Sequence, residues 1–567
     1  MRATARDTER EALPADVVGR HRTGLARRTA LISGLTLISR LLGFVREILS
    51  ASLFGHASGL FDAFLTAWRV PNLFRRFLGE GAISAALQTK LTEVDHDRGE
   101  AAGRALFLAT AGLVTRLLVV ITALTMLGAY YLPDDVSIAG TRVLGADAAE
   151  LRELVVRLSP FVILICLTAI ASGGLQVRGH FAAPAFAPVV LNIVWIASLV
   201  VVGVAFDGFV MRSTVDPTLD RAREVSMVRG LAWGVLFAGV CQLLVQLPAL
   251  RHTRLVGGKP ADAEGRAQAR AGARAVLKRS LPLALGAAVY QVNVMVDGLM
   301  AESLLPNGGP TAHYFANRVQ QFPMALISIA ATSAVFPALA ALGKTGDRDG
   351  LRGLHDRTQR AVAFVALPAS AGLFALASPI MSSLFEHGRY GPEGVARAAD
   401  ALRALSFAIL PAGAVGLCAR TYYALGDFRT PAVVSIAMLV LNFGLNLLLI
   451  VGLDYDVDGL AWATALTSWA NLAVLWPGLS GKLGLPHVSA GFVRGLGGSV
   501  AAATASGLAA WAAWTFSAPH FGTLLATAFG IAAGVGAEVL VAVRLDLPEA
   551  RLVRERLGKA RRKPPAA

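Results

Sequence analysis

Long apolar segments, separated by short polar connections, make up most of this chain. Each segment is close to the length of about 20 residues that a helix needs to cross the hydrocarbon core of a bilayer. Two such segments open the chain, at 29–54 and 60–87. Further segments follow at 102–131, 152–175, 184–206, 228–250, 277–301, 312–341, 357–380, 400–424, 430–452, 458–478, 491–516 and 521–545. The pattern predicts an all-α integral membrane protein of about 14 transmembrane helices, with both termini on one side.

Composition and charge agree with a membrane protein. The chain is 55% hydrophobic and 16% charged, whereas a soluble globular protein has about 25% charged residues. The net charge is +15, but Lys and Arg gather in the two tails and in alternate connections, as cytoplasmic loops do. We therefore expect both termini to be cytoplasmic. No basic stretch is combined with stacking aromatic residues in a soluble unit, which argues against a nucleic-acid partner.

The chain lacks the sequence motifs of enzymes and metal sites. Its three cysteines lie inside apolar segments without a CxxC pair, and its histidines are not at metal-ligand spacing. Nucleotide-binding and nucleophile motifs are also missing. We therefore expect a transporter rather than an enzyme, with no cofactor and no bound metal. An ion gradient, the membrane potential or the substrate gradient would drive it.

Two stretches of the chain are alike at a constant offset. Residues 158–184 and 405–431 share Leu, Ser, Gly, Phe and Pro at corresponding positions. Internal repeats of this kind underlie many transporter folds, in which the substrate binds between two lobes. The predicted parts are a basic cytoplasmic tail (1–28), an N-terminal six-helix lobe (29–250), a basic cytoplasmic linker (251–279), a C-terminal six-helix lobe (280–478), two extra transmembrane helices (491–546) and a basic cytoplasmic tail (547–567).

Charged residues interrupt the first two apolar segments. They are Arg40, Arg46, Glu47, Asp62, Arg69, Arg75, Arg76 and Glu80. An arginine at the centre of a spanning helix costs about 2.5–3.5 kcal/mol, so such groups face a protein interior or a water-filled cavity and mark a path for a charged substrate. For Arg75, Arg76 and Glu80 the alternative is that they reach out to the membrane surface.

Helical spacing sorts the charges of the first segment. Residues seven apart share a helix face, so Arg40 lies under Glu47 and the two could partly neutralise each other. Ser39 lies under Arg46, which leaves Arg46 without a carboxylate on its own face. The spacing therefore predicts that Arg46 is free to meet an anion.

The second half of the chain offers one further arginine and one carboxylate. Arg318 occupies the repeat position of Arg69, which itself forms a predicted in-helix pair with Asp62. Arg318 is thus the second-half candidate for an anion contact. Asp297 could balance Arg318, bind a cation, carry a proton or simply be held by a neighbouring helix. Further polar residues on apolar segments are Asn442, Asn446 and Thr464, for which interhelical hydrogen bonds are the simplest role.

Five stretches carry a family resemblance. They are SRLLGFVRE (39–47), DAFLTAWRVPNLFRRFLGEGAIS (62–84), ANRVQQFP (316–323), YYALGDFRTP (422–431) and GLAWATAL (459–466). Together they resemble the MurJ (MviN) family, the lipid II flippases of bacterial cell-wall synthesis, in the multidrug/oligosaccharidyl-lipid/polysaccharide exporter superfamily. The resemblance implies two six-helix lobes, a last helix pair that forms a hydrophobic groove beside a central cavity, and a location in the bacterial cytoplasmic membrane.

The resemblance also implies roles for the charged residues. Arg40, Arg46, Arg75 and Arg318 would meet the pyrophosphate of the substrate, which suits guanidinium groups because they stay charged and donate paired hydrogen bonds. Supporting polar positions would be Ser39, Glu47, Asp62, Arg69 and Glu80. The family usually reads more like AFSQAFVP after the position of Gly81, where this chain reads AISAALQTK. That change puts the exit of the second segment and its gate in question.

Some family members bind a sodium ion through a carboxylate on the seventh segment and polar groups on the eleventh and twelfth. The corresponding residues here would be Asp297, Asn442, Asn446 and Thr464. Asn446 stands where a carboxylate would strengthen such a site, so either sodium or proton coupling is compatible with the resemblance.

The implied function is transport of lipid II, an undecaprenyl-pyrophosphate-linked saccharide, from the inner to the outer leaflet by alternating access. Export of another lipid-linked oligosaccharide is the nearest alternative. A cationic-drug exporter would instead need a cavity dominated by carboxylates. A membrane scaffold that recruits cell-wall synthesis enzymes through its basic loops, or a membrane enzyme, would be a different class of protein.

Overall fold

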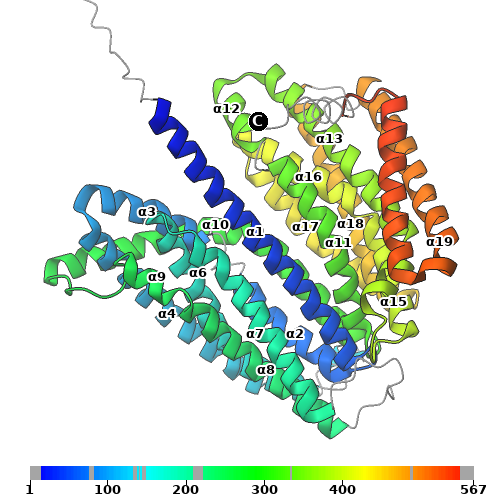
Figure 1. Cartoon of the computed structure of the whole chain (residues 1–567). Helices are drawn as coiled ribbons and strands as arrows, with labels where there is room; N and C mark the ends of the chain where they lie inside the picture. The colour runs from blue at the N-terminus through cyan, green and yellow to red at the C-terminus, as the bar shows by residue number, and fades with distance from the viewer. Residues whose placement is uncertain are drawn as a thin grey trace, which may run out of the picture.

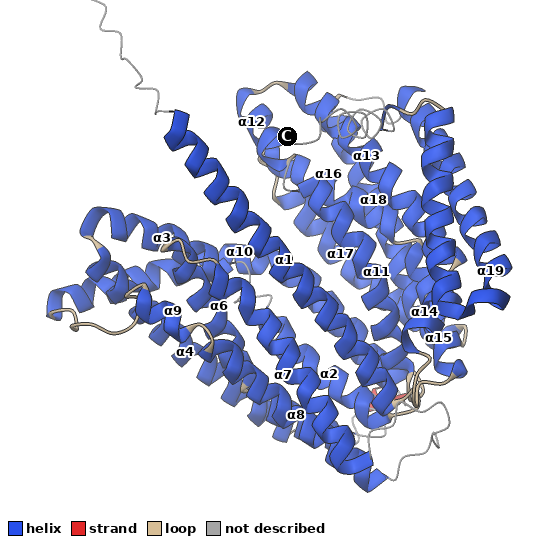
Figure 2. Cartoon of the chain, viewed as in Figure 1, coloured by secondary structure: helices blue, strands red, loops and turns tan. Residues whose placement is uncertain are grey.

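A computed structural model describes residues 15–75, 82–131, 137–138, 141–142, 148–207, 221–332, 335–484 and 490–549. These residues are almost entirely helical, as the hydrophobic pattern predicts (Figure 2). Glu80 and Arg76 lie outside the described residues, as do most of the two predicted tails. The predictions for them therefore stay predictions.

The first half of the chain forms nine helices within the described residues and one short hairpin. They are α1 (Ala15–Phe54), α2 (Gly59–Phe74), α3 (Ala82–Arg98), α4 (Glu100–Tyr130), the antiparallel strands β1 (Ser137–Ile138) and β2 (Thr141–Arg142), α5 (Ala148–Leu158), α6 (Phe161–Val177), α7 (Ala182–Asp207), α8 (Arg221–Leu244) and α9 (Leu247–His252). Ser58 caps α2, because its side chain accepts a hydrogen bond from the N–H of Phe61.

The second half is helical throughout its described part. Its helices are α10 (Ala263–Leu304), α11 (Gly309–Thr332), α12 (Phe336–Thr345), α13 (Arg348–Ala375), α14 (Ala377–Phe385), α15 (Pro392–Ser406), α16 (Ile409–Ala424), α17 (Arg429–Leu447) with a π-helical turn at Leu448–Gly452, α18 (Val457–Leu483) and α19 (Ala490–Arg544). Long α19 bends at Gly522, whose φ of 72° lies in the left-handed region that favours glycine.

The predicted apolar segments lie on these helices, but several segments are bent rather than straight. The ninth and tenth fall on the pairs α13–α14 and α15–α16, which bend by 70° and 42°. Among the described residues, six helices are long and apolar enough to cross a membrane, or up to eight if each bent pair is one span. The number of about 14 transmembrane helices therefore stays a prediction.

The helices form two groups that converge at one end of the molecule (Figure 1). Helices α3, α4 and α6–α9 lie in one group, α11–α19 lie in the other, and α1 runs between them. The groups converge where α1 ends and diverge toward the start of α1. The six-plus-six division of the chain remains an interpretation of the repeat.

The predicted linker 251–279 is not an extended loop over its whole length. Helix α10 begins inside it, at Ala263, with Asp262 as its cap. This part of α10 packs on the first group of helices: a Cβ on Gly272 would be 2.7 Å from Leu106, and the Arg98 guanidinium donates to the Gln268 side chain at 2.8 Å. The linker is therefore half helix, docked against the N-terminal lobe.

The two repeated stretches end in the same turn. Gly179 after α6 and Gly426 after α16 have φ values of 72° and 79°. In each turn the next residue donates its N–H to a carbonyl five residues earlier, His180 to Leu175 at 2.8 Å and Asp427 to Tyr422 at 2.9 Å. This is a Schellman-type helix end, for which glycine is favoured. Equal geometry at corresponding positions supports the internal repeat.

Candidate functional site

A cavity of about 680 Å³ lies between the two groups of helices, and its wall is built by α1, α2, α6, α7, α8 and α11. All four arginines predicted to bind the substrate line it: Arg40, Arg46, Arg75 and Arg318. Ser39 and Glu47 line it as well. Glu47 is the only carboxylate in the lining formed by the described residues. The cavity therefore carries an excess of positive charge inside an apolar protein.

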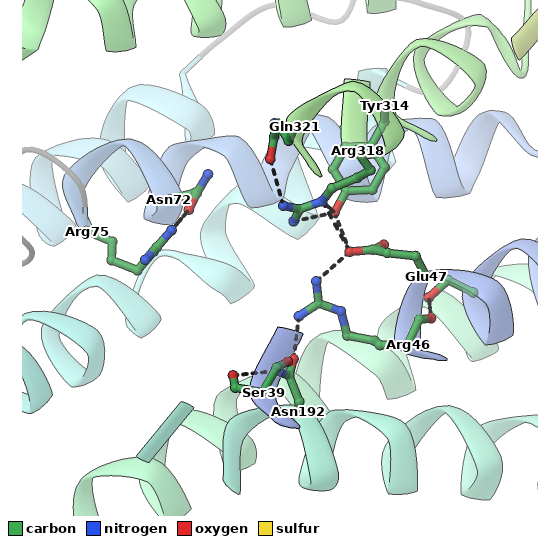
Figure 3. A network of polar contacts seen from close by, with 10 residues as sticks. Ser39, Arg46, Glu47, Asn72, Arg75, Asn192, Tyr314, Arg318 and Gln321 are labelled. Carbon is green, nitrogen blue, oxygen red and sulfur yellow. Dashed lines mark hydrogen bonds and ion pairs between the residues drawn. The ribbon is translucent and has the colours of Figure 1, made fainter. Parts of the chain in front are cut away.

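Arg46 is held on three sides within this cavity, and Figure 3 shows two of them, Asn192 and Glu47. One guanidinium nitrogen donates to Asn192 Oδ1 at 3.1 Å, the other lies 2.5 Å from Glu47 Oε1, and the group stacks 4.3 Å from the centre of the Trp195 ring. The prediction that Arg46 lacks a carboxylate partner was wrong. Helical spacing places adjacent residues on different faces, but the long arginine side chain turns back to its neighbour.

Glu47 connects the two groups of helices. Its Oε1 accepts a hydrogen bond from the Tyr314 hydroxyl at 2.9 Å and lies 3.4 Å from Arg318 Nε. Arg318 in turn donates to the Tyr314 hydroxyl at 2.9 Å. Glu47 thus pairs with Arg46 and Arg318, and the predicted pair with Arg40 is not formed. Two arginines from distant parts of the chain share this one buried carboxylate.

The other two arginines lie apart from this network. Arg75 donates twice to Asn72 Oδ1, at 3.1 and 2.8 Å, and Figure 3 shows the pair across the cavity from Arg46. Arg40 lines the cavity and also lines an apolar groove beside it, which is described next. The arginines are therefore spread along the cavity rather than gathered at one point.

The apolar groove has a volume of about 760 Å³ and runs between α1, α11, α13, α14 and both limbs of α19. Arg40 and Phe322 line both this groove and the arginine cavity. A polar chamber and an apolar channel therefore meet at these two residues, as an amphiphilic ligand requires. The resemblance implied such a groove beside the last two helices.

Asp62 and Arg69, which helical spacing paired on α2, have separate partners. Asp62 accepts hydrogen bonds from the N–H groups of Gly308 and Thr311 at 2.5 and 2.9 Å, at the start of α11. Arg69 donates to the carbonyl of Val294 on α10 at 3.2 Å. Neither residue lines the arginine cavity. Asp62 joins α2 to the start of α11 and Arg69 joins α2 to α10, so we interpret the Asp62 contact as an interlobe contact.

Three of the four ion-coupling candidates lie together. Asp297 Oδ1 accepts from Asn446 Nδ2 at 2.9 Å, and the same amide nitrogen lies 3.3 Å from Asn442 Oδ1. All three side chains are buried. Thr464 is not part of this cluster, because its hydroxyl donates to the Leu460 carbonyl of its own helix. Asp297 does not balance Arg318, whose carboxylate partner is Glu47.

Sequence reasoning missed three residues of the arginine network. Asn192 also donates to the Ser39 carbonyl at 2.9 Å and so ties α7 to α1. Tyr314 lies one helical turn before Arg318, and Asn72 lies one turn before Arg75. Tyr314 and Asn72 could have been identified from the sequence, because each is a polar residue one helical turn from an intramembrane arginine. Nothing in the sequence near Asn192 points to α1.

Comparison with known proteins connects this geometry to one family. Residues 50–530 match the family model described as lipid II flippase MurJ. The chain is 31% identical over 497 residues to the lipid II flippase MurJ of Burkholderia cenocepacia, covering 87% of this chain and 91% of that protein. It is 30% identical over 546 residues to the probable lipid II flippase MurJ of Vibrio cholerae, covering 92% and 97%.

Solved structures with the same fold are more distant in sequence. An inward closed conformation of lipid II flippase MurJ superposes with a TM-score of 0.68 at 19% identity, over 91% of this chain and 99% of the other. An inward-facing multidrug resistance MATE family transporter of the MOP superfamily gives 0.61 at 12% identity, over 80% and 98%. The fold is thus that of a multi-pass transporter. Given the family match over most of its length, the chain belongs to the MurJ family of lipid II flippases.

Proposed function

We propose that the protein moves lipid II from the inner to the outer leaflet of the bacterial cytoplasmic membrane. The observation that carries the proposal is the meeting of a cavity lined by four arginines with an apolar groove at Arg40 and Phe322. An undecaprenyl-pyrophosphate-linked saccharide has one charged diphosphate, a polar head and a long apolar chain. The cavity suits the diphosphate and the polar head, and the groove suits the apolar chain.

The diphosphate would bind at Arg46 and Arg318. Guanidinium groups donate paired hydrogen bonds to phosphate oxygens and stay charged at any physiological pH. Glu47 occupies both of them in this structure, at 2.5 and 3.4 Å. A diphosphate therefore has to compete with Glu47 or share the two arginines with it. In this way Glu47 compensates the buried charge of Arg46 and the partly exposed charge of Arg318 when the cavity holds no substrate.

Alternating access would exchange contacts at the end where the two groups of helices converge. There the Arg389 N–H donates to the Ser52 carbonyl at 3.0 Å, and the Arg389 guanidinium donates to the Leu53 carbonyl at 2.8 Å. The Asp62 contacts to Gly308 and Thr311 lie at the same interface. Opening this end would break these bonds and release the headgroup on the other side of the membrane.

Orientation follows from charge. The basic connections and tails favour cytoplasmic termini, so the converging end of the lobes would face outward and the cavity would be reached from the cytoplasmic side. Cell-wall synthesis enzymes are the natural partners, because they make and consume the substrate at the two membrane surfaces.

Asp297 would carry the coupling ion, either a sodium ion or a proton. Hard cations prefer oxygen ligands, and Asp297, Asn442 and Asn446 supply them. Asn446 Oδ1 is buried and has no hydrogen-bond partner among the described residues, so it is available as a ligand. No group of three or more His, Cys, Asp or Glu side chains gathers in the described residues. The membrane potential or the substrate gradient would be the alternative sources of energy.

Rescue of a bacterium depleted of its own lipid II flippase tests the proposal, together with a leaflet-accessibility assay for lipid II. We expect the wild-type protein to restore growth and outer-leaflet lipid II, and Arg46→Ala and Arg318→Ala to restore neither at equal membrane abundance. Arg157→Ala is the matched control, since Arg157 pairs with Glu153 outside the cavity at 2.5 Å.

The two parts of the proposal can fail separately. Rescue by Arg46→Ala and Arg318→Ala at wild-type levels would refute the role of the arginines. A wild-type protein that is abundant in the membrane but moves no lipid II, and moves a different lipid-linked oligosaccharide, would refute the substrate.

A further inference from the structure

One wall of the arginine cavity carries an amide that the arginine network does not use. Gln242 on α8 lines the cavity and is 4% exposed. Its Oε1 atom is buried and has no hydrogen-bond partner within the described part of the chain. A buried acceptor without a donor destabilises a protein. An acceptor of this kind on a cavity wall is therefore suited to a ligand that brings a donor.

The next glutamine along the chain, Gln246, is a buried amide whose oxygen and nitrogen both have hydrogen-bond partners. Gln246, one turn further along, is fully buried. Its Oε1 accepts from the Ser172 hydroxyl at 3.2 Å, and its Nε2 donates to the Thr168 carbonyl at 3.3 Å. Gln246, in the turn between α8 and α9, ties this turn to α6 and does not line the cavity. The two glutamines differ in that only Gln242 lines the cavity with an unpaired acceptor.

Two aromatic rings line the same cavity as Gln242. Trp68 and Phe161 both line the cavity and pack edge to face, with ring centres 4.9 Å apart. A Cβ on Gly239, three residues before Gln242, would be 2.8 Å from the Phe161 ring. Phe161 is therefore packed directly on α8 beside Gln242. This wall combines neutral amide and aromatic groups, in contrast to the charged network at Arg46, Glu47 and Arg318.

We propose that this wall is the subsite for the saccharide, and that Gln242 is a specificity-determining residue that accepts a hydrogen bond from an amide N–H or hydroxyl of an N-acetylated sugar. Phe161 is 1% exposed and packs against Trp68, so Trp68, at 9%, offers the apolar surface for the C–H face of a sugar ring. The diphosphate, bound at Arg46 and Arg318, fixes one end of the headgroup. The wall then distinguishes between the saccharides that are attached to the diphosphate. The proposal rests on the proposed function, because it assumes a lipid-linked saccharide.

Two ligands that differ only in the saccharide and peptide attached to the diphosphate separate this subsite from the diphosphate site. Binding of lipid II and of undecaprenyl diphosphate is measured to the purified protein in lipid nanodiscs. The wild-type protein should prefer lipid II. We expect Gln242→Leu to weaken lipid II binding about tenfold, since one hydrogen bond is lost, and to leave undecaprenyl diphosphate binding unchanged. Arg46→Ala should weaken the binding of both ligands.

Gln246→Leu, four residues further along the chain, is the matched control. It should lower the melting temperature, because two interhelical hydrogen bonds are lost, without changing the preference for lipid II over undecaprenyl diphosphate. Gln242→Met, of nearly the same size as glutamine, serves as a second variant. Retained binding of undecaprenyl diphosphate by either Gln242 variant shows that the protein is folded.

Equal weakening of both ligands by Gln242→Leu and Gln242→Met, or no weakening of lipid II, would overturn the subsite. A wild-type protein that binds both ligands equally tightly would overturn it as well, while leaving the arginine site in place. A wild-type protein that binds neither ligand would refute the proposed function itself.

Discussion

Replacing Glu47 by glutamine tests the central network most directly. Glu47 is 4% exposed and compensates the charges of Arg46 and Arg318. Glutamine has nearly the same shape and keeps an acceptor for the Tyr314 hydroxyl, but it removes the negative charge. The buried guanidinium of Arg46 and the partly exposed guanidinium of Arg318 are then left without a carboxylate.

The expected loss of stability is substantial. Removing one partner of a buried ion pair costs about 3–5 kcal/mol, because the other charge stays buried. Arg46 keeps its bond to Asn192 and its stacking on Trp195, so we expect the lower end of this range, about 3 kcal/mol. In contrast, the same change at Glu153, which is paired on the surface with Arg157, should cost only about 0–1 kcal/mol.

Thermal unfolding in detergent, with and without undecaprenyl diphosphate, measures both effects. Apparent melting temperatures are compared at one heating rate, since unfolding of such proteins is irreversible. Glu47→Gln should melt lower than wild type, whereas Glu153→Gln should not. The ligand should then raise the melting temperature of Glu47→Gln more than that of wild type, because the diphosphate no longer competes with Glu47. Unchanged stability together with unchanged ligand stabilisation in Glu47→Gln would refute the account of Glu47 as the resting counter-charge.

Three further predictions concern other parts of the molecule. Asp62→Asn should weaken the contacts to Gly308 and Thr311, and so increase the labelling of a cysteine introduced at the converging end of the lobes; equal labelling would contradict the gate. Asp297→Asn should abolish the dependence of transport on a sodium or proton gradient, measured in proteoliposomes, and retained dependence would place the coupling site elsewhere. Hydrogen bonds from Lys482 and Thr430 lower the pKa of Asp427 from its usual 3.8. The ionised Asp427 should therefore stabilise the folded protein fully above pH 3.8, and this stabilisation should be lost as the pH falls through the lowered pKa. Melting temperatures of Asp427→Ala and wild type should accordingly converge in acid, and a constant difference would exclude this ionisation as the cause.

Hydrophobic periodicity was sufficient to predict where the helices lie, because each apolar segment has to be helical to satisfy its backbone in lipid. It was not sufficient to predict the bends, since those at α13–α14 and α15–α16 depend on packing. The arginines of the cavity could be identified for the same reason as the helices: charge in an apolar segment is costly and needs a polar environment.

The partners of those charges could not be predicted. Positions seven apart suggested Arg40 with Glu47 and Asp62 with Arg69. Instead, Glu47, Asp62 and Arg69 contact groups from other helices, and Arg40 is exposed. Glu47 meets Arg318 on α11, more than 200 residues away, and Asp62 meets the start of that same helix. Helical spacing describes one isolated helix, whereas a buried charge takes the partner that tertiary packing brings closest.

Helix α10 has a mechanical consequence for any motion of the lobes. It is one helix of 42 residues, attached to the N-terminal lobe at Gly272 and to the C-terminal lobe at Asp297. With a rise of 1.5 Å per residue, the two attachments are about 38 Å apart along a single rod. Such a rod transmits force between the lobes, and it prevents them from separating freely as a slack linker would allow. Because Arg69 of α2 also donates to the Val294 carbonyl, the end of α10 near Asp297 contacts both lobes, and rocking has to bend α10 or break one of these contacts.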